Sequence, residues 1–193
     1  MKKVDLIVTA PHIYTMKGEG VGYEEKKALV VDGSKIIDIV DIDKLSDQYE
    51  AEEQLDMSHH ILLPGFIDAH MHTSCNIMRD TNNWMMYGLQ PFDNAATQAE
   101  KDIGCPVALI EAAKAGTTTM GDYEANMDAS CNFIAKLGTR GNVTLMIRSA
   151  KRKVYKPGGL YEFDDAMGEA SLNANIALYD KWHGYDGGRM KVL

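Results

Sequence analysis

The sequence is poor in cysteine, and its cysteines lack the spacing that a disulfide framework or a zinc knuckle would need. Three cysteines, Cys75, Cys105 and Cys131, occur among 193 residues, and no CxxC pair is present. An odd number of widely separated thiols argues against a small disulfide-stabilised secreted domain. Reduced thiols are typical of the cytoplasm, so we predict a cytoplasmic protein.

Long apolar runs and an excess of basic residues are also absent. No stretch approaches the roughly 20 apolar residues of a membrane span, and the charge of Asp5 beside a short apolar run does not make a signal-peptide core. The formal net charge is -8, whereas phosphate binding needs a basic surface. We therefore expect neither a membrane nor a nucleic acid as a partner.

The first 60 residues have the pattern of β structure. Val4–Thr9 is a short apolar strand, and two further apolar runs flank the Asp32-Gly33 step. Glycine tolerates the positive φ of a tight turn, so this step predicts a β-hairpin.

After Pro64 the chain alternates between strand and helix patterns. A nearly continuous apolar run over 61–72 is typical of a strand buried on both faces. The other predicted elements are helices over 99–115, 127–137 and 163–182, and strands over 116–122, 142–148 and 189–193. The first of these helices places its apolar residues near one face: Ile103, Val107, Ile110 and Ala113. Gly138 occupies a helix C-cap position.

This alternation predicts βα units and a parallel sheet, and hence an α/β fold. The residues from 61 onward are about half of the roughly 250 that a (β/α)8 barrel needs. The sheet is therefore either small and open or the first half of a TIM-type barrel, and we favour the half barrel. A half barrel leaves two unpaired strand edges, so we expect the remainder from another chain or from residues beyond Leu193.

The most informative residues are His70 and His72, which end the first barrel strand. Side chains alternate along a strand, so we predict that Asp68, His70 and His72 share one face and that Ile67, Ala69 and Met71 share the other. At the C-terminal end of a barrel strand, both imidazoles can reach one metal ion. Imidazole nitrogen suits zinc or ferrous iron, of which we favour zinc. Asp68 is expected to orient a ligand ring through a hydrogen bond.

The context of this histidine pair resembles a known family. Residues 63–72 read LPGFIDAHMH and residues 115–122 read AGTTTMGD, and these motifs resemble the amidohydrolase superfamily. The nearest branch looks like the cyclic deaminases and chlorohydrolases, which include guanine, cytosine and S-adenosylhomocysteine deaminases and s-triazine hydrolases. The resemblance implies a (β/α)8 barrel preceded by part of a small β-sandwich, with residues 1–60 in the sandwich and residues 61–193 as barrel strands 1–4.

The resemblance also implies a ligand set. In this family two histidines from the first barrel strand share one metal ion with a histidine from strand 5, another from strand 6 and an aspartate from strand 8. His70 and His72 would be the first two ligands. A glutamate three residues after the strand-5 histidine shuttles protons in this branch. By sequence order those strands would lie beyond Leu193, so no general acid or base is assigned in this chain.

The activity that the resemblance implies is hydrolytic. A metal-bound hydroxide would attack a ring carbon that carries an amino group or a halide, and so deaminate or dechlorinate a nucleobase-like or triazine-like heterocycle. The substrate is then a small molecule, and we expect a homo-oligomer or a complementing C-terminal half. Two alternatives stay open, namely a cyclic amidase acting on a hydantoin or imidazolone, and a truncated or split chain that serves only in assembly.

Three further residues are candidates for specific roles. Trp84 resembles a tryptophan that related deaminases place against the substrate ring, and packing of its ring on the core is the alternative. Arg148 ends the third barrel strand, where similar enzymes have an arginine that binds a polar substrate group; a salt bridge between loops is the alternative. Asp122 ends the second strand, and we expect it to cap the following helix.

Overall fold

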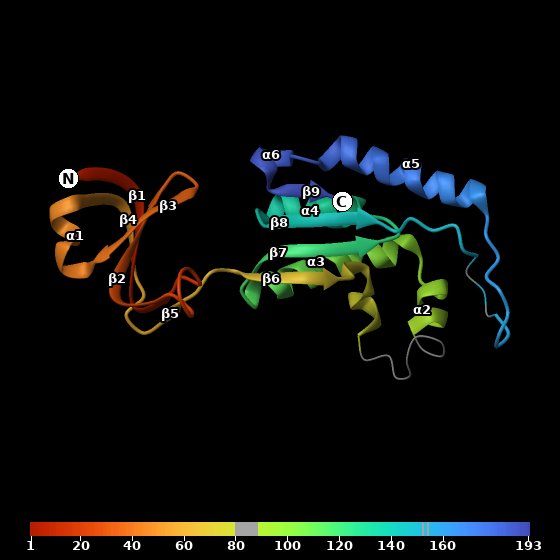
Figure 1. The fold of residues 1–193 in the computed structure, drawn as a ribbon, viewed down its shortest axis with the longest axis horizontal. Helices are drawn as coiled ribbons and strands as arrows, with labels where there is room; N and C mark the ends of the chain where they lie inside the picture. The colour runs from red at the N-terminus through yellow and green to blue at the C-terminus, as the bar shows by residue number, and fades with distance from the viewer. Residues whose placement is uncertain (80–88, 152, 154) are drawn as a thin grey trace. The chain divides into compact units, whose positions relative to one another are not determined.

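The structure, a computed structural model, describes residues 1–79, 89–151, 153 and 155–193 (Figure 1). Contacts within the chain divide it into two units, Met1–Pro64 and Gly65–Leu193. The division falls at the Pro64-Gly65 step, where the sequence pattern changes.

The N-terminal unit is a five-stranded sheet with one short helix. Its elements are β1 (Lys2–Tyr14), β2 (Tyr23–Asp32), β3 (Lys35–Asp41), α1 (Ile42–Gln48), β4 (Tyr49–Asp56) and β5 (Ile61–Leu62). The strand order is β3-β2-β1-β4, and β5 also pairs with β1. The β1–β2 and β2–β3 pairs are antiparallel, whereas β4 and β5 run parallel to β1.

The predicted hairpin is confirmed at the Asp32-Gly33 step. Asp32 pairs with Lys35 across the turn, and Gly33 has a φ of 60°, which favours glycine. Helix α1 was not predicted, because residues 1–60 were expected to be β structure. Its seven residues bury no side chain fully, and the two apolar residues Ile42 and Leu45 make too short a pattern to predict a helix.

The Gly65–Leu193 unit is built on a parallel sheet whose strands lie in chain order. The strands are β6 (Phe66–Met71), β7 (Thr117–Glu124), β8 (Arg140–Leu145) and β9 (Met190–Val192). The longer helices are α3 (Gln98–Lys114), α4 (Asp128–Leu137) and α5 (Asp165–Trp182), and the short ones are η1 (Thr73–Met78), α2 (Leu89–Ala95) and α6 (Tyr185–Gly188). The predicted alternation of strand and helix is thereby confirmed, although β8 ends at Leu145 rather than at residue 148.

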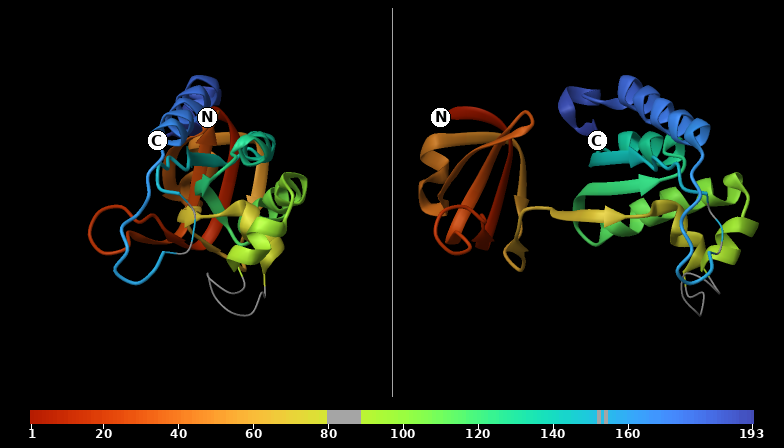
Figure 2. Two further views of the ribbon diagram at one scale, coloured as in Figure 1. Left: turned by 90° about the vertical axis from the view of Figure 1, so that its right-hand side faces the viewer. Right: turned by 45° about the vertical axis from the view of Figure 1, so that its right-hand side comes forward.

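The three longer helices cover one face of this sheet (Figure 2). Buried residues of β7 and β8, including Met120 and Val143, pack there against Leu109, Ile134 and Leu178 of the helices. Side chains on the other face are open, and the Ile67 side chain at that face is 71% exposed. Gly138, at a φ of 80°, ends α4 as predicted.

The orientation of α3 differs from the prediction. Of the residues predicted near one face, Ala113 packs against the core. Ile103, Val107 and Ile110 are 66%, 46% and 43% exposed, whereas Cys105 and Leu109 are buried. On the buried side, α3 approaches η1 closely at Gly104, where a Cβ would lie 3.0 Å from the Cγ2 atom of Ile77 and 3.1 Å from the carbonyl oxygen of Ser74. The absence of a side chain at Gly104 therefore permits this approach of α3 to η1.

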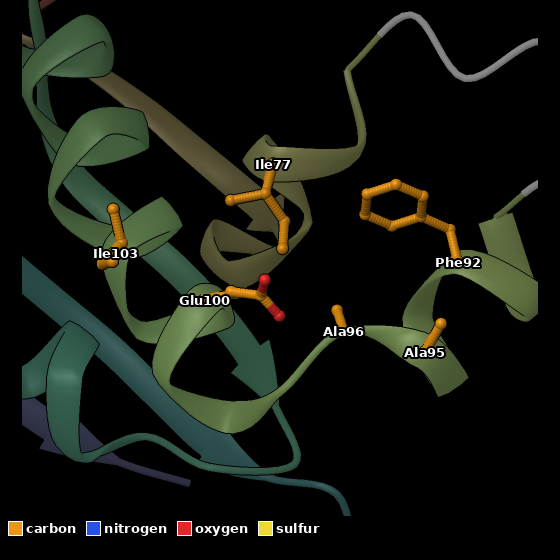
Figure 3. Close-up of a pocket in the computed structure, with 6 residues that line it drawn as sticks. All are labelled: Ile77, Phe92, Ala95, Ala96, Glu100 and Ile103. Atoms are coloured by element: carbon orange, nitrogen blue, oxygen red, sulfur yellow. The ribbon is translucent and has the colours of Figure 1, made fainter.

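Ile103 lies instead at a cavity between η1, α2 and α3 (Figure 3). The cavity has a volume of about 410 Å³, and its apolar lining includes Ile77 and Phe92. In the described part of the chain, none of the helices combines the length and apolar character that a membrane crossing requires.

Candidate metal centre

His70 and His72 lie at the C-terminal end of β6, and their rings converge. Their Nε2 atoms are 3.2 Å apart, and the ring planes are almost perpendicular, at 88°. Two nitrogen ligands at about 2.0–2.1 Å from one tetrahedral ion lie about 3.3 Å apart. The separation of the two Nε2 atoms therefore fits two ligands of a single divalent ion.

The His72 ring is held by the neighbouring strand. Its Nδ1 atom lies 2.5 Å from the backbone carbonyl oxygen of Tyr123 in β7. Because a carbonyl oxygen only accepts, we assign the ring proton to Nδ1, which leaves the Nε2 lone pair directed at His70. This is the tautomer that a metal ligand needs. Sequence reasoning missed the contact because a main-chain acceptor leaves no side-chain signal.

One extra residue in β6 interrupts the alternation of its side chains. The register between β6 and β7 shifts between Asp68 and Met71, where β6 has one residue more than β7. Ile67, Asp68, Ala69 and His70 all line one cavity, whereas Met71 packs against the apolar core. The predicted division of the strand into two faces therefore stays a prediction.

Strand β7 approaches this bulge closely at Gly121. A Cβ atom at that position would lie 2.6 Å from the carbonyl oxygen of Ala69, which is too close for any side chain. Glycine is therefore required where the motif AGTTTMGD passes the histidine strand.

Asp68 bonds to the main chain. Its Oδ1 atom accepts a hydrogen bond from the backbone N–H of His70 at 3.2 Å. The ring acceptor found among the described residues is the carbonyl of Tyr123. The role of Asp68 in orienting a ligand ring stays a prediction.

The turn after His72 is tied to β7 by two buried carboxylates. Asp122 accepts from the backbone N–H of Thr73 at 3.2 Å and from the Thr73 hydroxyl at 2.6 Å. Glu124 accepts from the backbone N–H of Ser74 at 2.9 Å. Burial raises the pKa of the Glu124 carboxyl above its ordinary value, and the hydrogen bonds from Ser74 oppose that rise.

The predicted capping role of Asp122 is wrong. Helix α4 begins after Met127, which provides no side-chain cap. The Asp122 carboxylate instead accepts from the hydroxyl of Ser130 within α4 and from Thr73 across the strand end. The carboxylate that the sequence pattern assigned to a helix terminus therefore binds the turn after β6 instead.

A cavity of about 410 Å³ opens beside His70 on the uncovered face of the sheet. Its lining includes Tyr123 from β7 and Asn142 and Thr144 from β8. The Thr144 hydroxyl donates to the carbonyl oxygen of Leu193 at 3.0 Å. The cavity therefore offers an aromatic ring and an amide side chain close to the histidine pair.

The amidohydrolase family model matches residues 61–192, which include the histidine pair and the sheet around it. The chain belongs to the amidohydrolase family. The resemblance seen in the two sequence motifs is thereby confirmed.

Similar proteins include deaminases and a chlorohydrolase. A 5'-deoxyadenosine deaminase of Methanobrevibacter smithii is 29% identical over 178 residues, which are 88% of this chain and 37% of that protein. The structure of an adenosine deaminase from Xanthomonas campestris with bound zinc matches with a TM-score of 0.82 at 16% identity, over 99% of this chain and 42% of that one. The structure of an atrazine chlorohydrolase from Arthrobacter aurescens TC1, complexed with zinc, matches with a TM-score of 0.74 at 19% identity. The match covers 97% of this chain and 45% of that chain.

These structural matches show that the chain has a mixed α/β fold like that of the matched regions of these proteins. The chain spans about two fifths of the length of the proteins it matches. Within the residues that the structure describes, no three or more His, Cys, Asp or Glu side chains gather as a metal-binding group.

The two predicted substrate residues have different outcomes. Trp84 lies outside the described residues. Arg148 lies beyond the end of β8 with its side chain half-buried, and its backbone N–H donates to the hydroxyl of Ser171 at 3.0 Å. It is not among the residues that line the cavity beside His70. Its contact with a substrate stays a prediction.

Proposed function

We propose that this amidohydrolase chain provides the first two metal ligands of a hydrolase that removes an amino group from a nucleobase-like heterocycle. The observation that carries the proposal is the His70–His72 pair, whose Nε2 atoms lie 3.2 Å apart. A divalent ion bound there would supply the activated water for hydrolysis. Zinc is favoured over iron because imidazole suits it and because the two solved structures described above hold zinc.

The chain's own residues prepare the site for such a ligand. The Tyr123 carbonyl keeps the proton on Nδ1 of His72, so that Nε2 is free to bind without losing a proton first. The Tyr123 ring and the Asn142 amide line the adjoining cavity, whose volume of about 410 Å³ suits a small heterocycle. We further propose that Trp84 and Arg148 contact the substrate.

Deamination is favoured by the similarity to a 5'-deoxyadenosine deaminase over 88% of the chain. Dechlorination of a triazine-like ring is the second candidate, because the atrazine chlorohydrolase has a similar fold. Both reactions replace a leaving group on an electron-poor ring carbon with a hydroxyl, so the same pair of histidines can serve either.

We also propose that β6–β9 are the first four strands of an eight-stranded barrel and that the N-terminal unit is part of a β-sandwich. The strands are parallel and in chain order, and Ile67 on their uncovered face is 71% exposed. The remaining ligands and the proton-shuttling carboxylate would then come from further strands, in the same polypeptide or in a complementing chain. A homo-oligomer and a cytoplasmic location stay predictions.

The test compares the full-length protein with its His70→Ala and His72→Ala variants. We expect about one zinc or iron ion per active site by mass spectrometry and release of ammonia from 5'-deoxyadenosine, with chloride release from atrazine as the measure of dechlorination. Loss of a residue that only hydrogen-bonds to a metal ligand typically lowers metal affinity by about 10–100-fold. Each variant removes a ligand itself, so we expect at least that loss. His12→Ala is the control, because that ring contacts Tyr23 in the N-terminal unit.

Metal binding and activity that survive both substitutions would disprove the proposal. Ring opening of a hydantoin without ammonia release would favour the cyclic amidase. A wild-type protein that binds no stoichiometric metal would favour a role in assembly alone.

A further inference from the structure

Three consecutive residues after the bulge of β6 each form hydrogen bonds with a different one of three consecutive residues at the end of β7. The bonds join His72 to Tyr123, Thr73 to Asp122, and Ser74 to Glu124. The first bond fixes a histidine ring directly. Of the other three, two restrain the backbone N–H groups of Thr73 and Ser74 and one restrains the Thr73 hydroxyl.

The two carboxylates occupy positions where apolar residues would pack at lower cost. Met120, Asp122 and Glu124 alternate along the helix-facing side of β7, and Met120 is fully buried in the apolar core. Asp122 is 1% exposed and Glu124 is 8% exposed. A buried carboxylate is unfavourable unless hydrogen bonds compensate it. Asp122 and Glu124 meet this condition through hydrogen bonds from Thr73, Ser74 and Ser130, so the burial of both acids depends on those contacts.

Their partners point to a role in the histidine pair. Among the described residues, the Glu124 carboxylate accepts from Ser74, and the Asp122 carboxylate accepts from Thr73 and Ser130. The backbone carbonyl oxygen of Glu124 accepts separately from Met146 in the loop after β8. The backbone N–H groups of Thr73 and Ser74 immediately follow His72, so these bonds restrain the peptide that leaves the ligand. Ser130 links the same carboxylate to α4, which anchors the arrangement to a helix.

We propose that Asp122 and Glu124 are positioning residues of the metal centre, which hold the turn after His72 so that its Nε2 atom faces that of His70. The inference rests on the proposed metal site. The carboxylates act through hydrogen bonds to the backbone and do not contact the ion. Without them the turn can move away from β7, and the His72 ring can lose both its carbonyl partner and its separation from His70.

The test measures cobalt(II) binding and the visible absorption of bound cobalt in the full-length protein and its variants. Glu124→Ala and Asp122→Ala should weaken cobalt binding by about 10–100-fold and change the absorption spectrum, because the ligand ring moves. Glu124→Gln and Asp122→Asn keep an acceptor oxygen for the same backbone N–H and should restore affinity to within a few-fold. Unfolding of the metal-free proteins by urea is measured in parallel.

The control is Asp164→Ala. Asp164 accepts a hydrogen bond from the backbone N–H of Met167 at the start of α5, so it is a carboxylate with a purely structural contact. This variant should unfold at lower urea and bind cobalt with unchanged affinity and spectrum. If Asp122→Ala does not fold, Glu124→Ala alone decides the question.

Wild-type affinity and spectrum in the alanine variants would overturn the inference and leave the histidine site intact. Failure of Gln and Asn to restore binding would also overturn it, because charge rather than hydrogen bonding would then be the cause. If the wild-type protein itself binds no cobalt, the proposed function falls as well.

Discussion

Gly121 is the residue at which β7 comes closest to the bulge of β6. An added Cβ atom would meet the carbonyl oxygen of Ala69 at 2.6 Å, and a backbone oxygen cannot rotate away as a side chain can. We expect Gly121→Ala to destabilise the protein by about 1–3 kcal/mol, the usual cost of overpacking. Urea unfolding measures the change.

Gly141 in β8 provides the matched control for that substitution. A Cβ atom there would lie 3.3 Å from the Cδ1 atom of Ile134, the end of a flexible side chain. Gly141→Ala should therefore cost less than Gly121→Ala. Equal effects of the two substitutions would show that the approach of β7 to Ala69 is not a constraint.

Asp41 in the N-terminal unit makes stability depend on pH. Hydrogen bonds from Lys27 at 2.7 Å and Lys44 at 2.9 Å lower the pKa of its carboxyl to about 2. Because the pKa in the folded chain lies below that in the unfolded chain, the stabilisation is present above about pH 4 and is lost as the pH falls toward 2. Asp41→Asn should flatten this acid limb in urea unfolding curves. The same pH dependence in variant and wild type would contradict the expectation.

At the scale of elements, α3 has a complete cap at its first turn. The Thr97 hydroxyl accepts from the backbone N–H of Glu100 at 3.3 Å, and the Glu100 carboxylate accepts from the backbone N–H of Thr97 at 2.7 Å. Thr97→Ala should reduce the free energy of unfolding by about 1 kcal/mol. Thr97→Ser keeps the hydroxyl and should remain close to wild type. Equal loss in both variants would assign the effect to the methyl group.

The elements themselves were largely predictable from the sequence, and their faces were not. The Asp32-Gly33 hairpin and the Gly138 helix end follow from local backbone chemistry, which a sequence displays directly. The buried side of α3 depends on how closely η1 approaches Gly104, which is a tertiary contact. Apolar periodicity predicted that the face of α3 with Ile103 would be buried. It considers only where apolar side chains lie along the helix, and it contains no information on the contact between η1 and Gly104.

The candidate site divides in the same way. The HxH pair was predictable because two imidazoles at the end of a strand have a recognisable spacing. The bulge of β6 and the carbonyl of Tyr123 were not, because any residue can form a bulge and every residue has a carbonyl. Asp122 was assigned to a helix cap, although it bonds across the sheet to Thr73.

At the scale of the whole molecule, the uncovered face of the β6–β9 sheet tests the proposed barrel. Ile67 is 71% exposed there, and a closed barrel would bury it. Ile67→Lys in the full-length protein should then cost several kcal/mol, since a buried unpaired charge is among the severest substitutions. Leu160, which is 90% exposed away from the regular elements, provides the control, and Leu160→Lys should change stability by less than about 0.5 kcal/mol. Equal, small effects would indicate that water covers the face.

Position 123 serves two purposes through different atoms. Its main-chain oxygen holds the His72 ring, and its side chain lines the neighbouring cavity. Because every amino acid has the same main-chain oxygen, the cavity wall can be redesigned at this position while the ligand ring keeps its partner. A library of substitutions at Tyr123 is therefore a way to retune which molecules enter the cavity at little cost to metal loading.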